Sequence, residues 1–180
     1  MKPVLKILFS IPILASVFSC NSPGRYTKEI SLVDSINIIL SSADSLLRSV
    51  DTAGMEKISL TISAELKIIN EKSSDTLSKD DAVLFDNYNG VEVVLEKSYS
   101  MIFVLLKNLK YSQLQVANLL GDLKKNIAEE TKVKSIIEKE RESAEKIHES
   151  SIVLSSAVKE NGLLFDSLNA RVKSYIQALK

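Results

Sequence analysis

Cysteine, proline, histidine and tryptophan are scarce in this chain of 180 residues, which has one Cys, three Pro, one His and no Trp. A single cysteine excludes an intrachain disulfide framework. All three prolines precede Gly24, so the rest of the chain lacks the residue that breaks helices most strongly. The formal net charge of +0 argues against a strongly basic nucleic-acid binder. With 45% apolar residues, the chain can form one compact domain and is not typical of a disordered protein.

Residues 1–19 have the composition of a targeting segment. Two lysines, Lys2 and Lys6, precede an apolar run over residues 7–18. This run is shorter than the roughly 20 residues that a membrane-spanning helix requires. We therefore interpret residues 1–19 as a signal peptide that is removed from the mature protein.

The apolar run ends in Val17-Phe18-Ser19-Cys20. This sequence resembles the box that lipoprotein signal peptidase recognises, with a large residue, Phe18, where a small one is usual. The resemblance implies cleavage before Cys20 and attachment of acyl chains to it, and residues 20–27 would then be a lipidated tether. An ordinary secretory signal that leaves Cys20 free is the alternative.

The remaining chain, residues 28–180, carries apolar residues every three or four positions, which is typical of amphipathic helices. Polar interruptions at residues 51–54 and 71–78 separate the first stripes. The pattern predicts an all-α domain, an antiparallel bundle of five to six amphipathic helices with short connections. Residues 58–62 also alternate as a strand would, so a strand remains the alternative there.

Local capping signals predict where these helices begin and end. Ser78, followed by two aspartates, is typical of an N-cap. Ser112-Gln113-Leu114-Gln115 fits a capping box and predicts a new helix. Gly162, after a polar stretch from Lys159, is typical of a left-handed C-cap. Residues 128–132 are either a bend or a solvated turn. Residues 102–106 are apolar on most faces, which predicts that their helix is the central and most enclosed one.

Catalytic and metal-binding motifs are missing from the sequence. His148 is the only histidine, and no Gly-x-Ser-x-Gly elbow or glycine-rich phosphate loop is present. Glu145 and His148 form half of a di-iron Glu-x-x-His motif, but no second histidine exists to complete it. We expect His148 to be a surface residue. The prediction is a protein without cofactor or metal that is not an enzyme.

Three sets of residues are candidates for contacts with a partner. Lys124, Lys125 and the lysines and arginine up to Arg141 could form a basic strip, but interleaved glutamates favour a mixed solvated face. Leu163 and Leu164 could remain outside the core as an apolar patch. Lys180, as the last residue, would present an ammonium and a carboxylate together, an arrangement that plasminogen kringles recognise.

The whole pattern resembles the helical surface lipoproteins of Borrelia-type spirochaetes. Residues 29–57, and above all Ser45-Leu46-Leu47-Arg48-Ser49-Val50-Asp51, are similar to the first helix of the outer surface protein C and variable small protein group. Size and layout also resemble the factor H-binding lipoproteins of relapsing-fever spirochaetes. The resemblance implies an outer-membrane, surface-exposed lipoprotein that captures a host protein, such as the complement regulator factor H or plasminogen. A structural or periplasm-facing envelope lipoprotein without a host ligand is the alternative.

Overall fold

The computed structural model of the chain describes residues 24–73 and 77–179. It contains four α-helices: α1 (Thr27–Arg48), α2 (Thr52–Lys72), α3 (Lys79–Lys124) and α4 (Glu130–Ala178). About 90% of the structure is helical, and the described ranges contain no strand. The predicted signal peptide, Cys20 and Lys180 lie outside the described residues.

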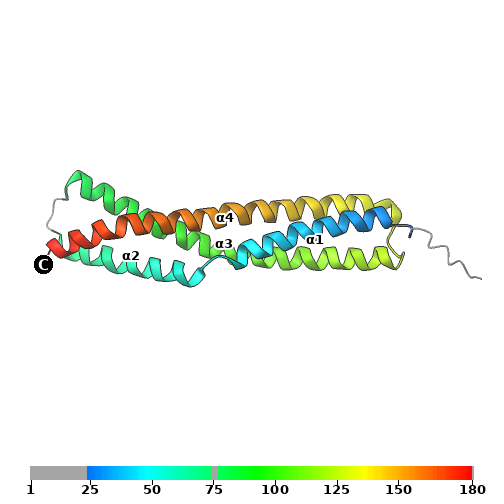
Figure 1. The fold of residues 1–180 in the computed structure, drawn as a ribbon, viewed down its shortest axis with the longest axis horizontal. Coiled ribbons are helices and arrows are strands. Elements are labelled where there is room, and N and C mark those ends of the chain that lie inside the picture. The colour runs from blue at the N-terminus through cyan, green and yellow to red at the C-terminus, as the bar shows by residue number, and fades with distance from the viewer. Residues whose placement is uncertain (1–23, 74–76, 180) are drawn as a thin grey trace, which may run out of the picture.

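The helices form a rod with three helices in cross-section (Figure 1). α3 and α4 each run along the whole rod, and at 1.5 Å per residue the 49 residues of α4 are about 70 Å long. α1 and α2 follow one another along the third edge and contact α3 and α4 but not each other. α1, α2 and α4 run in one direction and α3 runs in the other. The start of α1 and the α3–α4 turn therefore lie at one end of the rod.

The core is a continuous seam along the rod, and it confirms most of the predicted stripes. In α3 every third or fourth residue is buried from Leu84 to Leu123. In α1 the buried residues also recur every three or four positions, on the face that contacts α3 and α4. Buried residues of the other three helices are Val33, Ile36, Leu40, Ala43 and Leu47 in α1, Met55, Ile62 and Ile69 in α2, and Val133, Ile137, Ala144, Ile147, Ser151, Leu154, Phe165, Leu168 and Val172 in α4.

Four helices replace the predicted five to six because two predicted boundaries are wrong. Ser112 does not cap a new helix: it lies 2% exposed inside α3, between Leu109 and Val116, at a core position of an unbroken stripe. The alternating residues 58–62 are helical as well, so the strand alternative is also wrong.

Gly162 does not end a helix either, since α4 continues through it without a left-handed residue. The side-chain amide of Asn161 donates to the backbone carbonyl of Ala157 at 2.8 Å, one turn earlier in the helix. Leu154 before this segment and Phe165 after it are both buried, and their packing holds the helix across the glycine. Tertiary contacts therefore override the local stop signal.

Two helix ends agree with ordinary capping chemistry. The Ser78 hydroxyl accepts a hydrogen bond from the N–H of Asp81 at 3.1 Å, which confirms the predicted N-cap of α3. At the other end of α3, Asn126 has a φ of 56°, and the N–H of Ile127 donates to the carbonyl of Asp122 at 3.0 Å. This Schellman-type turn ends α3, with asparagine in the left-handed position that glycine usually takes.

The helix predicted from residues 102–106 to be the central and most enclosed one is α3. It contacts all three other helices, as α4 also does, but it is not enclosed on every face. Ile102 is only 2% exposed, but its neighbours Phe103 and Val104 are each 56% exposed. With only three helices in cross-section, each helix keeps an outward face, and α3 carries apolar residues on that face too.

By length and composition alone, the helical stretch Thr27–Lys72 contains a segment apolar enough to cross a membrane. In the bundle, 28% of that segment is buried, and α1 packs against both α3 and α4. Part of its apolar surface therefore lies in the bundle core, whereas Ile38 in the same stretch is 72% exposed.

Candidate functional site

The break between α1 and α2, halfway along the rod, is the main irregularity of the surface. The Asp51 carboxylate caps α2 by accepting a hydrogen bond from the N–H of Gly54 at 2.9 Å. At the end of α1, the Ser49 hydroxyl donates to the carbonyl of Leu46 at 2.7 Å. Because α1 and α2 do not form one continuous helix, a cleft lies on each side of the start of α2, one toward α3 and one toward α4.

Met55 lies between the two clefts and is 3% exposed. One cleft, of about 410 Å³, opens toward α3, and the other, of about 270 Å³, opens toward α4. The first is lined by Met55, Glu56, Ser59, Glu96, Tyr99 and Ser100. The second is lined by Asp51, Gly54, Met55, Ile58, Val158, Lys159, Gly162, Leu163 and Asp166.

The linings combine an apolar floor with polar side chains at the rim. Two carboxylates, Glu56 and Glu96, lie at the cleft toward α3, whereas the cleft toward α4 has Lys159 beside two aspartates. Within residues 24–73 and 77–179 no group of three His, Cys, Asp or Glu side chains could hold a metal ion. Such shallow, mixed clefts suit contact with side chains of another macromolecule.

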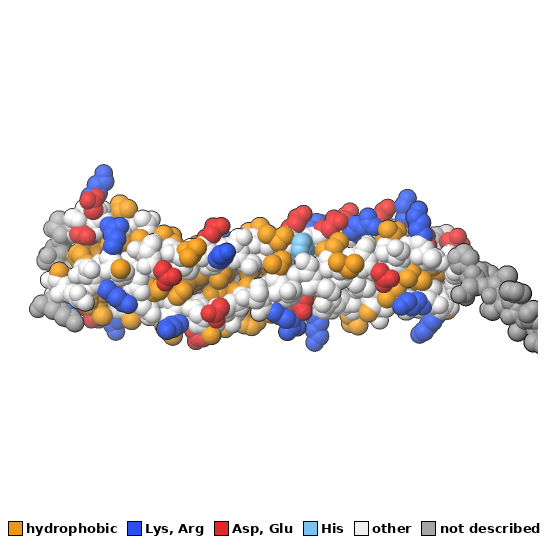
Figure 2. Space-filling model, viewed as in Figure 1, with side chains coloured by type: hydrophobic (Ala, Val, Ile, Leu, Met, Phe, Trp, Pro, Cys, Tyr) orange, Lys and Arg blue, Asp and Glu red, His pale blue; other side chains and the backbone are white. Residues whose placement is uncertain are grey.

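Leu163 and Leu164 occupy the outer side of α4 beside this break. Leu163 is 63% exposed and lines the cleft toward α4, and Leu164 is 42% exposed next to it. Figure 2 shows that hydrophobic side chains are exposed among charged ones along one face of the rod. Lys180 lies outside the described residues, so the structure does not place it near the two leucines.

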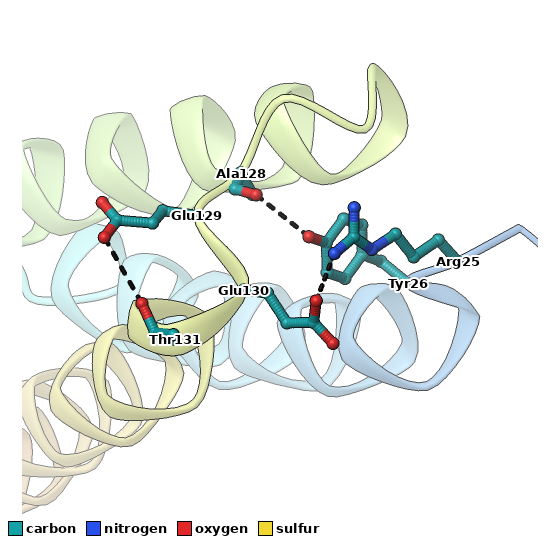
Figure 3. Close-up of polar contacts among 6 residues, drawn as sticks. All are labelled: Arg25, Tyr26, Ala128, Glu129, Glu130 and Thr131. Carbon is teal, nitrogen blue, oxygen red and sulfur yellow. Dashed lines mark hydrogen bonds and ion pairs between the residues drawn. The ribbon is translucent and has the colours of Figure 1, made fainter.

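A second set of contacts ties the start of α1 to the α3–α4 turn (Figure 3). Tyr26 is 4% exposed, and its hydroxyl donates to the carbonyl of Ala128 at 2.9 Å. Arg25 pairs with Glu130 and lies 5.2 Å from the centre of the Tyr26 ring. The hydrogen bond to Glu130 raises the pKa of Arg25. The bundle thus begins at Tyr26, inside the range that the sequence assigns to the tether.

Charged residues near this end form a mixed surface. Lys132 pairs with Glu129 at 2.7 Å, and Glu129 also accepts from the Thr131 hydroxyl at 3.3 Å (Figure 3). Acidic side chains are thus interleaved with the predicted basic strip, as expected for a mixed face.

His148 lies on α4, half-buried at the contact with α1. Its Nε2 is 3.0 Å from the hydroxyl of Ser42. His148 is visible at the surface, as the sequence predicts (Figure 2), and this hydrogen bond also joins α1 and α4.

The half of the rod farthest from Tyr26 contains a buried aromatic contact. Tyr88 is fully buried and stacks on Phe165, with ring centres 5.8 Å apart. Its hydroxyl donates to Glu65 at 2.6 Å. Burial, together with the hydrogen bond to the Glu65 carboxylate, raises the pKa of Tyr88 well above its usual value. The aromatic pair fixes the register of α3 against α4.

Several of these residues carried no recognisable signal in the sequence. Tyr26 was hidden in a segment interpreted as a tether, and its partner is 102 residues away. The interruption at residues 51–54 was visible, but the clefts beside it depend on how α2 packs against α3 and α4.

Comparison of the chain with protein-family models, curated proteins and solved structures finds no match.

Proposed function

We propose that this protein is a lipid-anchored outer-surface lipoprotein that binds a host macromolecule without catalysing a reaction. Acyl chains on Cys20 would hold one end of the rod at the outer membrane. The break between α1 and α2, together with Leu163 and Leu164, would be the contact surface. The resemblance to spirochaetal surface lipoproteins favours a complement regulator such as factor H, or plasminogen, as the ligand.

The observation that carries this proposal is the cleft toward α4. An exposed leucine, Leu163, beside a cleft with both charges at its rim is more typical of a protein-binding surface than of a solvated helix face. The direct contacts of Arg25 and Tyr26 with the turn support the anchor, because they keep the rod close to residue 20. Five residues separate Cys20 from Tyr26, and the six Cα–Cα steps between them span at most about 21 Å.

The anchor is tested by replacing Cys20 with alanine in the full chain. Acyl labelling should disappear, and the chain should leave the detergent phase of a phase-separation assay. Unchanged partitioning of the variant would show that another segment holds the protein, with the apolar stretch in Thr27–Lys72 the first to examine.

The ligand is tested by incubating the immobilised protein with serum and identifying retained proteins by mass spectrometry. Leu163→Glu should lose the retained protein, because it places a charge in the apolar part of the contact. Ile38→Glu is the matched control: Ile38 is also exposed, at 72%, but it lies on α1 away from the clefts. If plasminogen is retained, deleting Lys180 tests that residue as a contact. Retention that is equal in all variants, or no retention, contradicts the proposal.

A further inference from the structure

The outward face of α3 combines exposed apolar residues with lysines. Phe103, Val104, Tyr111 and Leu114 are between 56% and 66% exposed. At helical spacing, Lys107 lies between Phe103 and Tyr111 on this face. We call this set, with Lys110 and Val93, the α3 face. A helix segment that is apolar all round is usually buried, so these side chains favour a partner that covers them.

The outward face of α4 combines exposed apolar residues with glutamates. Ile152 and Val153 are 45% and 68% exposed. Three exposed glutamates, Glu142, Glu145 and Glu149, precede them on the same side of the helix. We call these five residues the α4 face. Among the described residues, the glutamates of this face and the lysines of the α3 face form no ion pair.

The two faces match in height along the rod. Val104 lies 20 residues before Lys124, the end of α3, and Ser150 lies 20 residues after Glu130, the start of α4. Because both helices rise 1.5 Å per residue, the two positions are level. The stacked rings of Tyr88 and Phe165 agree with this way of comparing heights. Tyr88 lies 36 residues before Lys124, and Phe165 lies 35 residues after Glu130, so the count places the two residues at nearly the same height.

The same residue count places complementary side chains of the two faces at the same height along the rod. Val104 is level with Ser150, two residues from Ile152. Lys107 is level with Ile147, two residues from Glu149. Lys110 is level with Ala144, directly before Glu145. Val104 thus faces an apolar part of α4, and Lys107 and Lys110 face glutamates, whereas Tyr111 is level with the residue after Glu142.

We propose that the α3 face of one molecule docks on the α4 face of a second copy of this chain standing beside it. When both rods are attached to one membrane at the Tyr26 end, they stand at equal height, and this part of the argument depends on the proposed anchor. The two helices then meet antiparallel, as α3 and α4 do within one bundle. The contact joins two different faces, so in a pair one molecule retains a free α4 face and the other a free α3 face. Further molecules can add at both, and the rods form a row or a ring.

The contact is a single helix pair, so it is smaller than a typical stable interface in solution. Attachment to a common membrane raises the local concentration of the rods and fixes their orientation. Association is therefore expected in the membrane.

Cysteine cross-linking of the full chain in membranes of the expressing cell tests this contact. A chain with Val104→Cys and Ile152→Cys should give a ladder of dimers, trimers and larger species upon oxidation, and each single variant should remain monomeric. Val104→Cys with Ser167→Cys is the matched control, since Ser167 is exposed on α4 but lies about 25 Å farther along the rod. It should give no ladder.

Either an equal ladder from the control or no ladder from the first pair would overturn the proposal. Strong dimers from Val104→Cys alone would overturn it as well, because they would show α3 paired with α3. The test does not depend on the acyl chains: an uncleaved signal segment would also hold the residue-20 end at the membrane, and lipidation is measured separately by acyl labelling.

A charge exchange tests the pairing of lysine with glutamate in the same cross-linking background. Lys107→Glu should reduce the ladder roughly three- to tenfold, because a like charge replaces an attractive one at the contact. Adding Glu149→Lys to the same chain should restore it. Loss without restoration would contradict the proposed register, since both positions are exposed and neither change disturbs the core.

Discussion

The hydroxyl of Tyr26 donates a hydrogen bond of 2.9 Å to the backbone carbonyl of Ala128, across 102 residues of sequence. This contact closes the end of the rod at which the chain enters the bundle. It joins the first turn of α1 to the α3–α4 turn, two segments that otherwise share only the Arg25–Glu130 pair among the described polar contacts at this end.

Tyr26→Phe should lower the free energy of unfolding by about 1 kcal/mol, because the carbonyl of Ala128 loses its donor while the ring still packs. Tyr111→Phe is the control, since the Tyr111 side chain is 66% exposed and its loss of a hydroxyl should change little. Chemical denaturation of both variants measures the difference. Equal stability of the two would show that the contact does not hold this end of the rod.

Two neighbouring residues of α3 test which face of the helix is buried. Ile102→Asp should destabilise the fold by more than about 3 kcal/mol, because it buries a charge without a partner. Phe103→Asp should cost less than about 1 kcal/mol at low protein concentration, because Phe103 is 56% exposed. Similar costs at the two positions would contradict the described orientation of α3.

Gly162→Ala tests whether α4 is continuous. No side chain lies within 4 Å of the position of an added Cβ, so alanine should stabilise the helix by roughly 0.5–1 kcal/mol. Gly90→Ala, in an equally open position inside α3, should give a similar gain. A loss of stability in Gly162→Ala would contradict a continuous α4. It would instead support the left-handed C-cap that the sequence predicts at this glycine.

Glu140 gives the fold a dependence on pH. Burial raises the pKa of Glu140 in the folded chain, so the folded chain holds its proton more readily than the unfolded chain does. The protonated Glu140 side chain therefore contributes stability at pH values below its pKa in the unfolded chain. This contribution is lost as the pH rises through its higher pKa in the folded chain. Glu140→Gln should therefore be slightly more stable than the natural chain at pH 7, by less than about 1 kcal/mol.

This advantage should vanish below about pH 4, where the natural Glu140 is itself protonated. Glu142→Gln, at an exposed position two residues along, is the control. Thermal unfolding at the two pH values measures both variants. An advantage of Glu140→Gln that persists at the lower pH would contradict burial as its cause.

Much of the fold follows from the phase of the apolar stripes. The stripe of α3 keeps its spacing across Ser112, and that of α4 keeps it from Leu154 to Phe165 across Gly162. The capping signals at Ser112 and Gly162 favour a helix end, but the continuous apolar stripe favours an unbroken helix. The stripe prevails because helix stability in a bundle comes mainly from the packed face. One helix ends and the next begins at three places: between Arg48 and Thr52, between Lys72 and Lys79, and between Lys124 and Glu130.

The candidate site was less predictable. Leu163 and Leu164 could be selected from the sequence as apolar residues outside the core, but the cleft beside Leu163 arises from the start of α2 packing against α4. The exposed position of Phe103 could not be predicted, because periodicity alone does not reveal how many helices surround α3. A bundle with three helices in cross-section leaves this residue outside.

The most direct test of the proposed surface function is proteinase treatment of intact cells that carry the full chain. An outer-surface lipoprotein should be degraded while the outer membrane is still closed, and a known periplasmic protein in the same cells should survive. Survival of the chain until the outer membrane is permeabilised would contradict the proposal and support the alternative of a periplasm-facing envelope lipoprotein.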